Sequence, residues 1–195
     1  MSRRRDPKNI AYRKPKHEFL EEVRGLPHRN LALELLRKLL NDQISARSRK
    51  NVVQARSFAE MLEKTIRQYQ SRAIEAAQVI RELIELAKQI REAQRRGEDL
   101  GLTEEELAFY DALEVNDSAV KVLGDETLRT IARELVENVR RDVTIDWTLK
   151  ESARAKLRTV VKRLLRKHGY PPDKQEKATK TVLEQAEILC KDWAA

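Results

Sequence analysis

The sequence is poor in several residue types, and each shortage excludes a class of protein. It has one cysteine, Cys190, five glycines, five prolines and 5% aromatic residues among 195. One cysteine cannot form an internal disulfide, and so little glycine and proline excludes collagen-like and low-complexity chains. No stretch approaches the roughly 20 uninterrupted apolar residues of a membrane span, and no apolar segment follows the charged N-terminus. We therefore expect a cytoplasmic protein that does not enter a membrane.

Charged residues, in contrast, are abundant and unevenly placed. They make up 37% of the chain, and the net charge is +8. Residues 1–50 hold 14 basic and 6 acidic residues, whereas residues 51–195 hold 26 of each. Residues 1–27 also contain three prolines and show no sustained apolar period, which predicts a basic arm or linker. The arm is interpreted equally well as a solvated tail or as a nucleic-acid contact, and residues 28–195 are predicted to form a single helical domain.

The longest periodic pattern predicts one long helix. From Leu62 to Ile90 the apolar or small residues recur in alternating steps of four and three, as in a heptad repeat. Because no glycine or proline lies between Lys50 and Arg96, we predict an uninterrupted helix of about 45 residues, 65–70 Å long at roughly 1.5 Å per residue. Alanines narrow its apolar stripe, so we expect helices of the same chain to cover it in a monomer, in preference to a homodimeric coiled coil.

Further helices are predicted before and after this one, so the fold class is all-α: a multi-helix bundle built around the long helix. Asn30 is a candidate N-cap for an apolar run that ends at Leu40, and a break is expected near residues 41–48. Thr103 and Glu106 have the spacing of a capping box. Three more predicted boundaries are Asp125 as a helix start, Gly169 as a helix stop and Pro171 before the last helix. Only residues 143–147 resemble a strand.

No known catalytic or cofactor motif is present. The sequence has no phosphate-binding glycine loop, no HExxH and no paired cysteines, and His17, His28 and His168 are far apart. Cys190 has no histidine at helical spacing, so a buried, inert thiol is expected. We therefore predict no catalytic, metal-binding or cofactor-binding residues, and no enzyme activity in this chain alone.

The strongest candidate for binding is a basic stripe on the helix predicted from about Thr148 to His168. Arg154, Arg158, Lys162 and Arg166 recur every four residues and would share one side of it. Such a stripe can follow the phosphates of a nucleic acid. A solvated face, or ion pairs with the acidic segment 98–117, would explain it as well. These four residues are therefore candidate contacts with DNA or with an acidic partner.

Several ordered blocks of the sequence resemble a known family. They are the run from NLALELLRKLL to IRELIELAKQIREA (30–93), GLTEEELAFYDAL (101–113), VTIDWTLKESARAKLRTVVKRLLRKHGYPP (143–172) and the closing VLEQAEIL. Together they resemble the C-terminal helical domain of the restriction (R) subunit of type I restriction enzymes, over about 165 of the 195 residues. The full R subunit of that family also carries a nuclease domain and two ATP-driven translocase domains.

The resemblance implies an assembly role. It suggests that this helical domain docks the motor and nuclease subunit onto the methyltransferase core, for ATP-dependent DNA translocation and restriction. The full subunit would use ATP and Mg²⁺, whereas this chain shows neither the nuclease motif nor an ATP-binding loop, and so resembles a fragment of a site-specific deoxyribonuclease. The alternative from the residues is a helical domain that binds DNA phosphates through its basic arm and basic helix.

Overall fold

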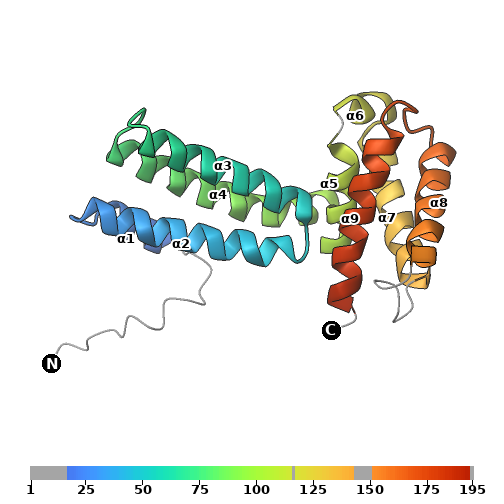
Figure 1. The fold of residues 1–195 in the computed structure, drawn as a ribbon, viewed down its shortest axis with the longest axis horizontal. Helices are drawn as coiled ribbons and strands as arrows, with labels where there is room; N and C mark the ends of the chain where they lie inside the picture. The colour runs from blue at the N-terminus through green and yellow to red at the C-terminus, as the bar shows by residue number, and fades with distance from the viewer. Residues whose placement is uncertain (1–16, 116, 143–150, 194–195) are drawn as a thin grey trace. The chain divides into compact units, whose positions relative to one another are not determined.

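A computed structural model describes residues 17–115, 117–142 and 151–193, and within them the secondary structure is helical throughout. Figure 1 shows these helices in chain order. The first four are α1 (His17–Arg24), α2 (Arg29–Ser48), α3 (Val52–Gln70) and α4 (Ala76–Leu100). They are followed by α5 (Glu104–Glu114), α6 (Asp117–Leu123), α7 (Asp125–Asp142), α8 (Glu151–Lys167) and α9 (Gln175–Trp193). The all-α prediction is confirmed for the described residues.

The predicted 45-residue helix is wrong, because a turn divides it into α3 and α4. The longest helix is α4, with 25 residues. The two helices form a hairpin (Figure 1), and the Thr65 hydroxyl on α3 donates to Glu82 on α4 across a distance of 3.2 Å. The apolar residues of both helices, such as Leu62 of α3 and Leu83 of α4, are buried within one chain.

The backbone conformation at this turn explains why the apolar periodicity of the sequence did not reveal it. The amide of Ala73 donates to the carbonyl of Gln68 at 2.9 Å, and the amide of Arg72 donates to that of Tyr69 at 3.0 Å. These two bonds form a Schellman motif, in which the residue after the helix has a left-handed conformation. That residue is Arg72, with φ of +59°. Glycine is the usual residue at this position, so an arginine there does not indicate a helix end in the sequence.

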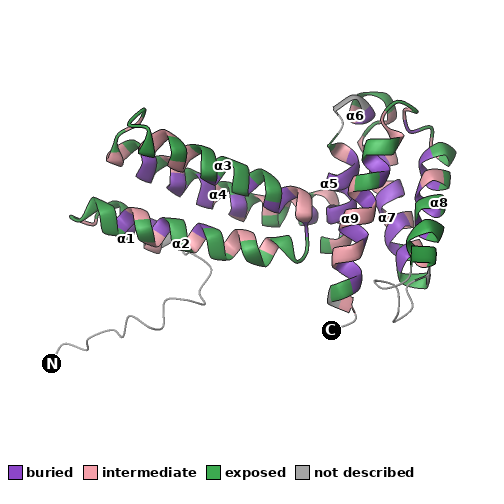
Figure 2. Ribbon diagram, viewed as in Figure 1, coloured by how far each residue is buried: buried purple, intermediate pink, exposed green. Residues whose placement is uncertain are grey.

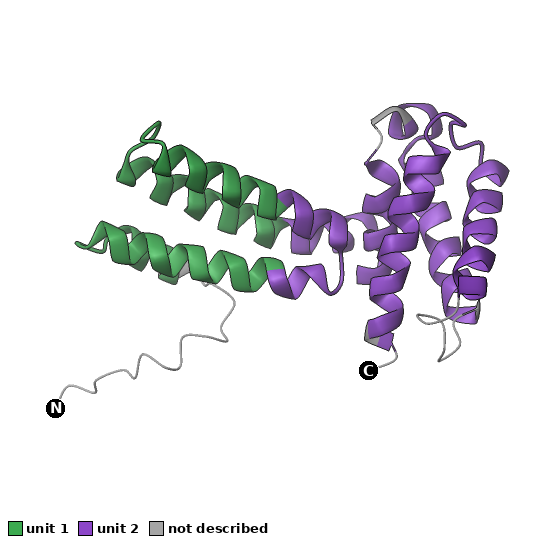
Figure 3. Ribbon diagram, viewed as in Figure 1, with its two compact units in different colours: residues 1–44, 58–92 green, residues 45–57, 93–195 purple. Residues whose placement is uncertain are grey.

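Two compact units make up the described structure (Figure 3). Unit 1 comprises residues 1–44 and 58–92, and unit 2 comprises residues 45–57 and 93–195. Unit 1 contains α1, most of α2 and the greater part of the α3–α4 hairpin. Its buried side chains come from all four helices: Leu20, Val23, Leu36, Leu40, Leu62, Val79, Leu83 and Ile90.

Unit 2 contains a bundle in which α5 packs against α7 and α9, and α8 packs against the same two helices. The helices α5 and α8 are therefore diagonal neighbours, while α6 lies against α5 and α7. Phe109, Leu135, Val161 and Leu165 fill the core without measurable exposure. Tyr170 is also buried among these helices, and its hydroxyl donates to the Leu113 carbonyl at 2.8 Å. Figure 2 shows the resulting inward, buried faces and outward, exposed faces of these helices.

Other sequence predictions have mixed outcomes. The capping box of Thr103 and Glu106 is present, and Gly169, with φ of +71°, follows the end of α8 as predicted. In the predicted arm, residues 17–24 form α1, because Leu20 and Val23 supply an apolar face too short to show a period. The break expected at residues 41–48 is wrong, since α2 continues to Ser48. The strand-like segment 143–147 lies outside the described residues.

Candidate interaction surface on α8

The helix α8 separates apolar and basic residues cleanly onto two sides. Its buried residues are Leu157, Val160, Val161, Leu164 and Leu165, and their spacing of three and four residues places them on one side. Glu151 lies in the first turn, and Arg166 and Lys167 lie in the last, so the charges complement the helix dipole at both ends. The packing of the apolar side against α7 and α9 therefore turns most of the basic residues toward solvent.

The structure shows that the four stripe residues differ in their contacts. Arg154 forms an ion pair with Glu187 of α9. Arg158 and Arg166 are exposed and Lys162 is half-buried, and none of these three forms an ion pair within the part of the chain that the structure describes. The stripe thus begins at the edge of α9 and continues as unpaired positive charge.

The hypothesis that the acidic segment 98–117 neutralises this stripe is wrong for the acids on α5. Glu104 pairs with Lys50 at 2.7 Å, Glu105 pairs with Arg140 of α7, and Glu114 pairs with Arg96 at the end of α4. The reason is topological, because α5 and α8 are diagonal in the bundle and do not pack against each other.

At the C-terminal end of α8, basic residues do have a partner. Glu134 of α7 accepts from Lys167 at 3.0 Å and lies 3.2 Å from Nε2 of His168. Burial alone would raise the pKa of Glu134, but the bonds from Lys167 and His168 outweigh it and the pKa is lowered. His168 directly follows α8, and Glu134 is a specific carboxylate partner for it.

A buried polar cluster around Asp111 escaped the sequence analysis. One carboxylate oxygen of Asp111 accepts from the side-chain amides of Asn51 at 2.7 Å and Gln54 at 2.6 Å, and the other accepts from Arg96 at 2.8 Å. Its side chain is only 3% exposed. Burial is the main effect on the pKa of Asp111 and raises it, although these donors oppose the shift. The cluster joins the start of α3, the end of α4 and the middle of α5.

Two further residues extend this cluster to α9 and to α2. Gln185 of α9 is fully buried, donates to the carbonyl of Lys50 at 2.7 Å and accepts from the amide of Val52 at 2.9 Å. Arg47 of α2 donates to Gln54 at 2.9 Å, and burial lowers the pKa of Arg47.

A sequence signal for this cluster existed only at Asn51, whose side chain caps α3 by accepting from the amide of Gln54. The bonds of Asn51 and Gln54 to Asp111, and of Val52 to Gln185, span 57 residues or more, and no local pattern encodes them.

Other features of the described residues concern metal ligands, the single thiol and a surface hollow. No group of three or more metal-ligating side chains occurs among them. Cys190 is buried as expected, and burial raises the pKa of its thiol to about 12, so it remains protonated at neutral pH. A surface hollow of about 460 Å³ lies along α3 and is lined mainly by charged and polar side chains such as Glu63, Lys64 and Arg67. In the described parts of the chain, no helix has the length and hydropathy needed to cross a membrane.

Comparison with known proteins decides the family. Residues 16–192 match the model of the "Type I restriction enzyme HindI endonuclease subunit-like, C-terminal" family. The chain belongs to this family. It is 39% identical over 175 residues to the type I restriction enzyme HindI endonuclease subunit of Haemophilus influenzae, an alignment that covers 90% of this chain and 17% of that protein. The resemblance inferred from the sequence blocks is thereby confirmed.

A second relative comes from an archaeon. The chain is 36% identical over 153 residues to a provisionally named type I restriction enzyme MjaIXP endonuclease subunit of Methanocaldococcus jannaschii, covering 78% of this chain and 15% of that protein. The chain thus spans about a sixth of the length of both relatives. No solved structure matches the chain.

Proposed function

We propose that this domain docks the endonuclease subunit of a type I restriction enzyme onto the methyltransferase core of the same complex. The observation that supports the proposal most is the family match over residues 16–192, which assigns the chain to the C-terminal region of that subunit. On this proposal the activities that need ATP and Mg²⁺ belong to the full subunit, and the chain contributes assembly.

The geometry of unit 2 suits such a role. Its hydrophobic core draws on α5, α7, α8 and α9, and the Asp111 cluster joins α3 and α4 to α5 by buried hydrogen bonds. A surface held by such a core changes little in shape on binding, which reduces the entropy lost in association. Two valines, Val115 just after α5 and Val122 near the end of α6, are 39% and 66% exposed. They add apolar area of the kind that protein interfaces use.

The test is assembly in solution. The purified chain is mixed with a methyltransferase–specificity core that binds the full endonuclease subunit, and the mixture is separated by size. We expect co-migration, and we expect an excess of the chain to displace the full subunit and to reduce ATP-dependent DNA cleavage. If the chain neither co-migrates nor competes at micromolar concentration, the docking function is wrong.

A pair of variants makes the test specific for the folded domain. Leu135→Asp places a charge at a core position with no exposure, so it should abolish both the helical fold of unit 2 and co-migration. Leu31→Asp alters an apolar residue of α2 that is 52% exposed, and it should retain the fold by circular dichroism. If Leu135→Asp lost its fold and still co-migrated, folded unit 2 would not be the docking element.

A further inference from the structure

Basic residues of unit 2 fall into two groups according to their contacts. Most of those near α5 and α7 are used within the fold: Arg96 contacts Asp111 and Glu114, Arg129 contacts Asp125, and Arg140 contacts Glu105. On α8 the pattern differs. Arg158, Lys162, Arg163 and Arg166 have no ion-pair partner within residues 17–115, 117–142 and 151–193. The described residues therefore supply no acidic partner for these four charges.

The unpaired positive charge is concentrated on one helix, α8, which is strongly basic. The sequence of α8 holds seven basic residues and one acidic residue, Glu151. Arg158, Lys162 and Arg166 are spaced at i, i+4 and i+8, so each repels the next along the helix surface. Like charges at this spacing weaken a helix, and no acid of the described structure offsets them. Their arrangement thus suits an anion from outside the fold.

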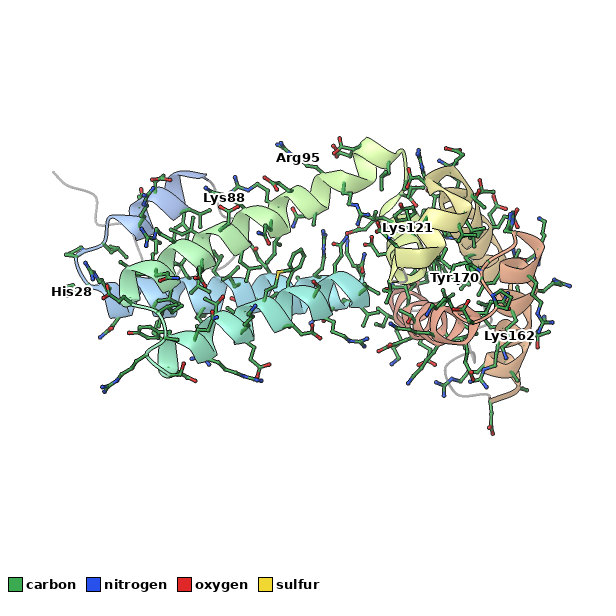
Figure 4. The ribbon with its side chains drawn as sticks, turned by 90° about the horizontal axis from the view of Figure 1, so that it is seen from above. His28, Lys88, Arg95, Lys121, Lys162 and Tyr170 are labelled. Carbon is green, nitrogen blue, oxygen red and sulfur yellow. The ribbon has the colours of Figure 1, made fainter. Side chains whose placement is uncertain are left out.

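The length and regularity of the stripe match a phosphate backbone. From Arg158 to Arg166 the helix rises about 12 Å, at roughly 1.5 Å per residue. Along the axis of a DNA duplex, one strand presents a phosphate about every 3.4 Å, so this length faces about three or four phosphates. Lys162 lies on α8 at the outer side of unit 2, whereas Tyr170 lies among the helices (Figure 4). A duplex can therefore approach the stripe without opening the core.

We propose that the basic face of α8, formed by Arg158, Lys162 and Arg166, binds the phosphate backbone of duplex DNA. Arg154 is excluded from this set because it is paired with Glu187. Contacts of this kind position a protein on the duplex without reading its sequence. The inference does not depend on the docking function, because it rests on unpaired charge on α8 and not on a protein partner.

The test compares two triple variants of the whole chain that lose the same charge. In the first, Arg158, Lys162 and Arg166 are changed to Gln. In the matched control, Arg37, Lys38 and Lys64 are changed to Gln; these are exposed bases of α2 and α3 without an ion pair in the described residues. Binding to a duplex of arbitrary sequence is measured from 50 to 200 mM salt, and thermal melting by circular dichroism verifies the fold of each variant.

We expect the α8 variant to bind DNA more weakly and with a flatter salt dependence. Each lost phosphate contact reduces the log–log slope by about 0.9, so three reduce it by up to about 2.7. Between 50 and 200 mM salt, the wild type should then lose up to about 40-fold more affinity than this variant. The control should keep the wild-type slope. Arg158→Lys with Arg166→Lys retains the charges and should also keep it, which provides a readout if the Gln variant unfolds.

Three results would overturn the proposal. In the first, the wild-type chain does not bind duplex DNA at 50 mM salt. In the second, both triple variants lose affinity equally, so that net charge and not the α8 face is responsible. In the third, the α8 variant keeps its DNA affinity but no longer co-migrates with the methyltransferase core. That last result would make the stripe a protein contact and would leave the docking function standing.

Discussion

Asp111 shows at the level of one residue how buried polarity can fix the geometry of a helical protein. Its two oxygens accept hydrogen bonds from residues of α3, α4 and the segment before α3. A buried carboxylate without donors would be costly, and each donor without its acceptor would be costly as well. The cluster therefore stabilises only the arrangement in which all of these segments are correctly placed.

Replacement of Asp111 tests this role. In Asp111→Ala, the buried amides of Asn51 and Gln54 lose an acceptor, at about 1–3 kcal/mol for each unsatisfied group. We expect the free energy of unfolding to fall by about 3 kcal/mol or more, measured by urea denaturation. Asp173→Ala is the matched control, because the side chain of Asp173 is 68% exposed and its ion pair among the described residues is with Lys174. Its effect should stay within about 1 kcal/mol. Equal losses in the two variants would contradict a structural role for the cluster.

At the scale of elements, the residues at helix ends determine how the chain is divided into helices. Three helices end in the same Schellman pattern: α3 at Arg72, α4 at Gly101 and α8 at Gly169, each with positive φ. The two glycines adopt this conformation readily, so each indicates a helix end in the sequence. Arg72 carries the steric cost of a left-handed residue, which other interactions of the hairpin must offset.

Arg72→Gly should therefore stabilise the α3–α4 hairpin. A left-handed residue with a β-carbon costs roughly 1–2 kcal/mol, and the greater freedom of glycine in the unfolded chain offsets part of the gain. We expect a net gain of about 0.5–1 kcal/mol, detected as a higher melting temperature. Arg72→Ala keeps the β-carbon and should bring no such gain. A lower melting temperature for Arg72→Gly would show that the arginine side chain itself stabilises the turn.

At the scale of the whole molecule, the hairpin decides the expected oligomeric state. The heptad-like stripe of 62–90 suggested either intramolecular cover or a coiled-coil dimer. In unit 1, Val79 and Leu83 of α4 have no exposure, and Leu62 of α3 is 5% exposed, within a single chain. Because helices of the same chain already cover these residues, a second copy has little apolar stripe left to bury.

We accordingly expect a monomer. Sedimentation equilibrium should give one mass of 22.7 kDa that does not change with protein concentration. The control is Leu83→Asp, in which the core of unit 1 is disrupted and apolar side chains are exposed, so self-association should appear. A reversible, concentration-dependent dimer of the wild-type chain would restore the coiled-coil interpretation.

The sequence alone determined the helical class, several helix boundaries and the family. These features have local causes. The capping box of Thr103 needs only residues three apart, the stop at Gly169 needs one glycine, and the inward face of α8 follows from the spacing of five apolar residues. The four stripe residues were found in the same way, although their role as contacts with DNA or with a partner stays a prediction.

Only the tertiary structure decided the turn at Arg72, the Asp111 cluster and the division of the stripe into paired and unpaired charges. A heptad pattern continues through a turn as easily as through a helix, so periodicity could not locate the hairpin. The Asn51–Asp111 bond joins residues 60 apart, and the Arg154–Glu187 pair joins residues 33 apart. Which acid meets which base depends on which helices are neighbours in the bundle, and that order is fixed by packing of the whole chain and not by any local segment of it.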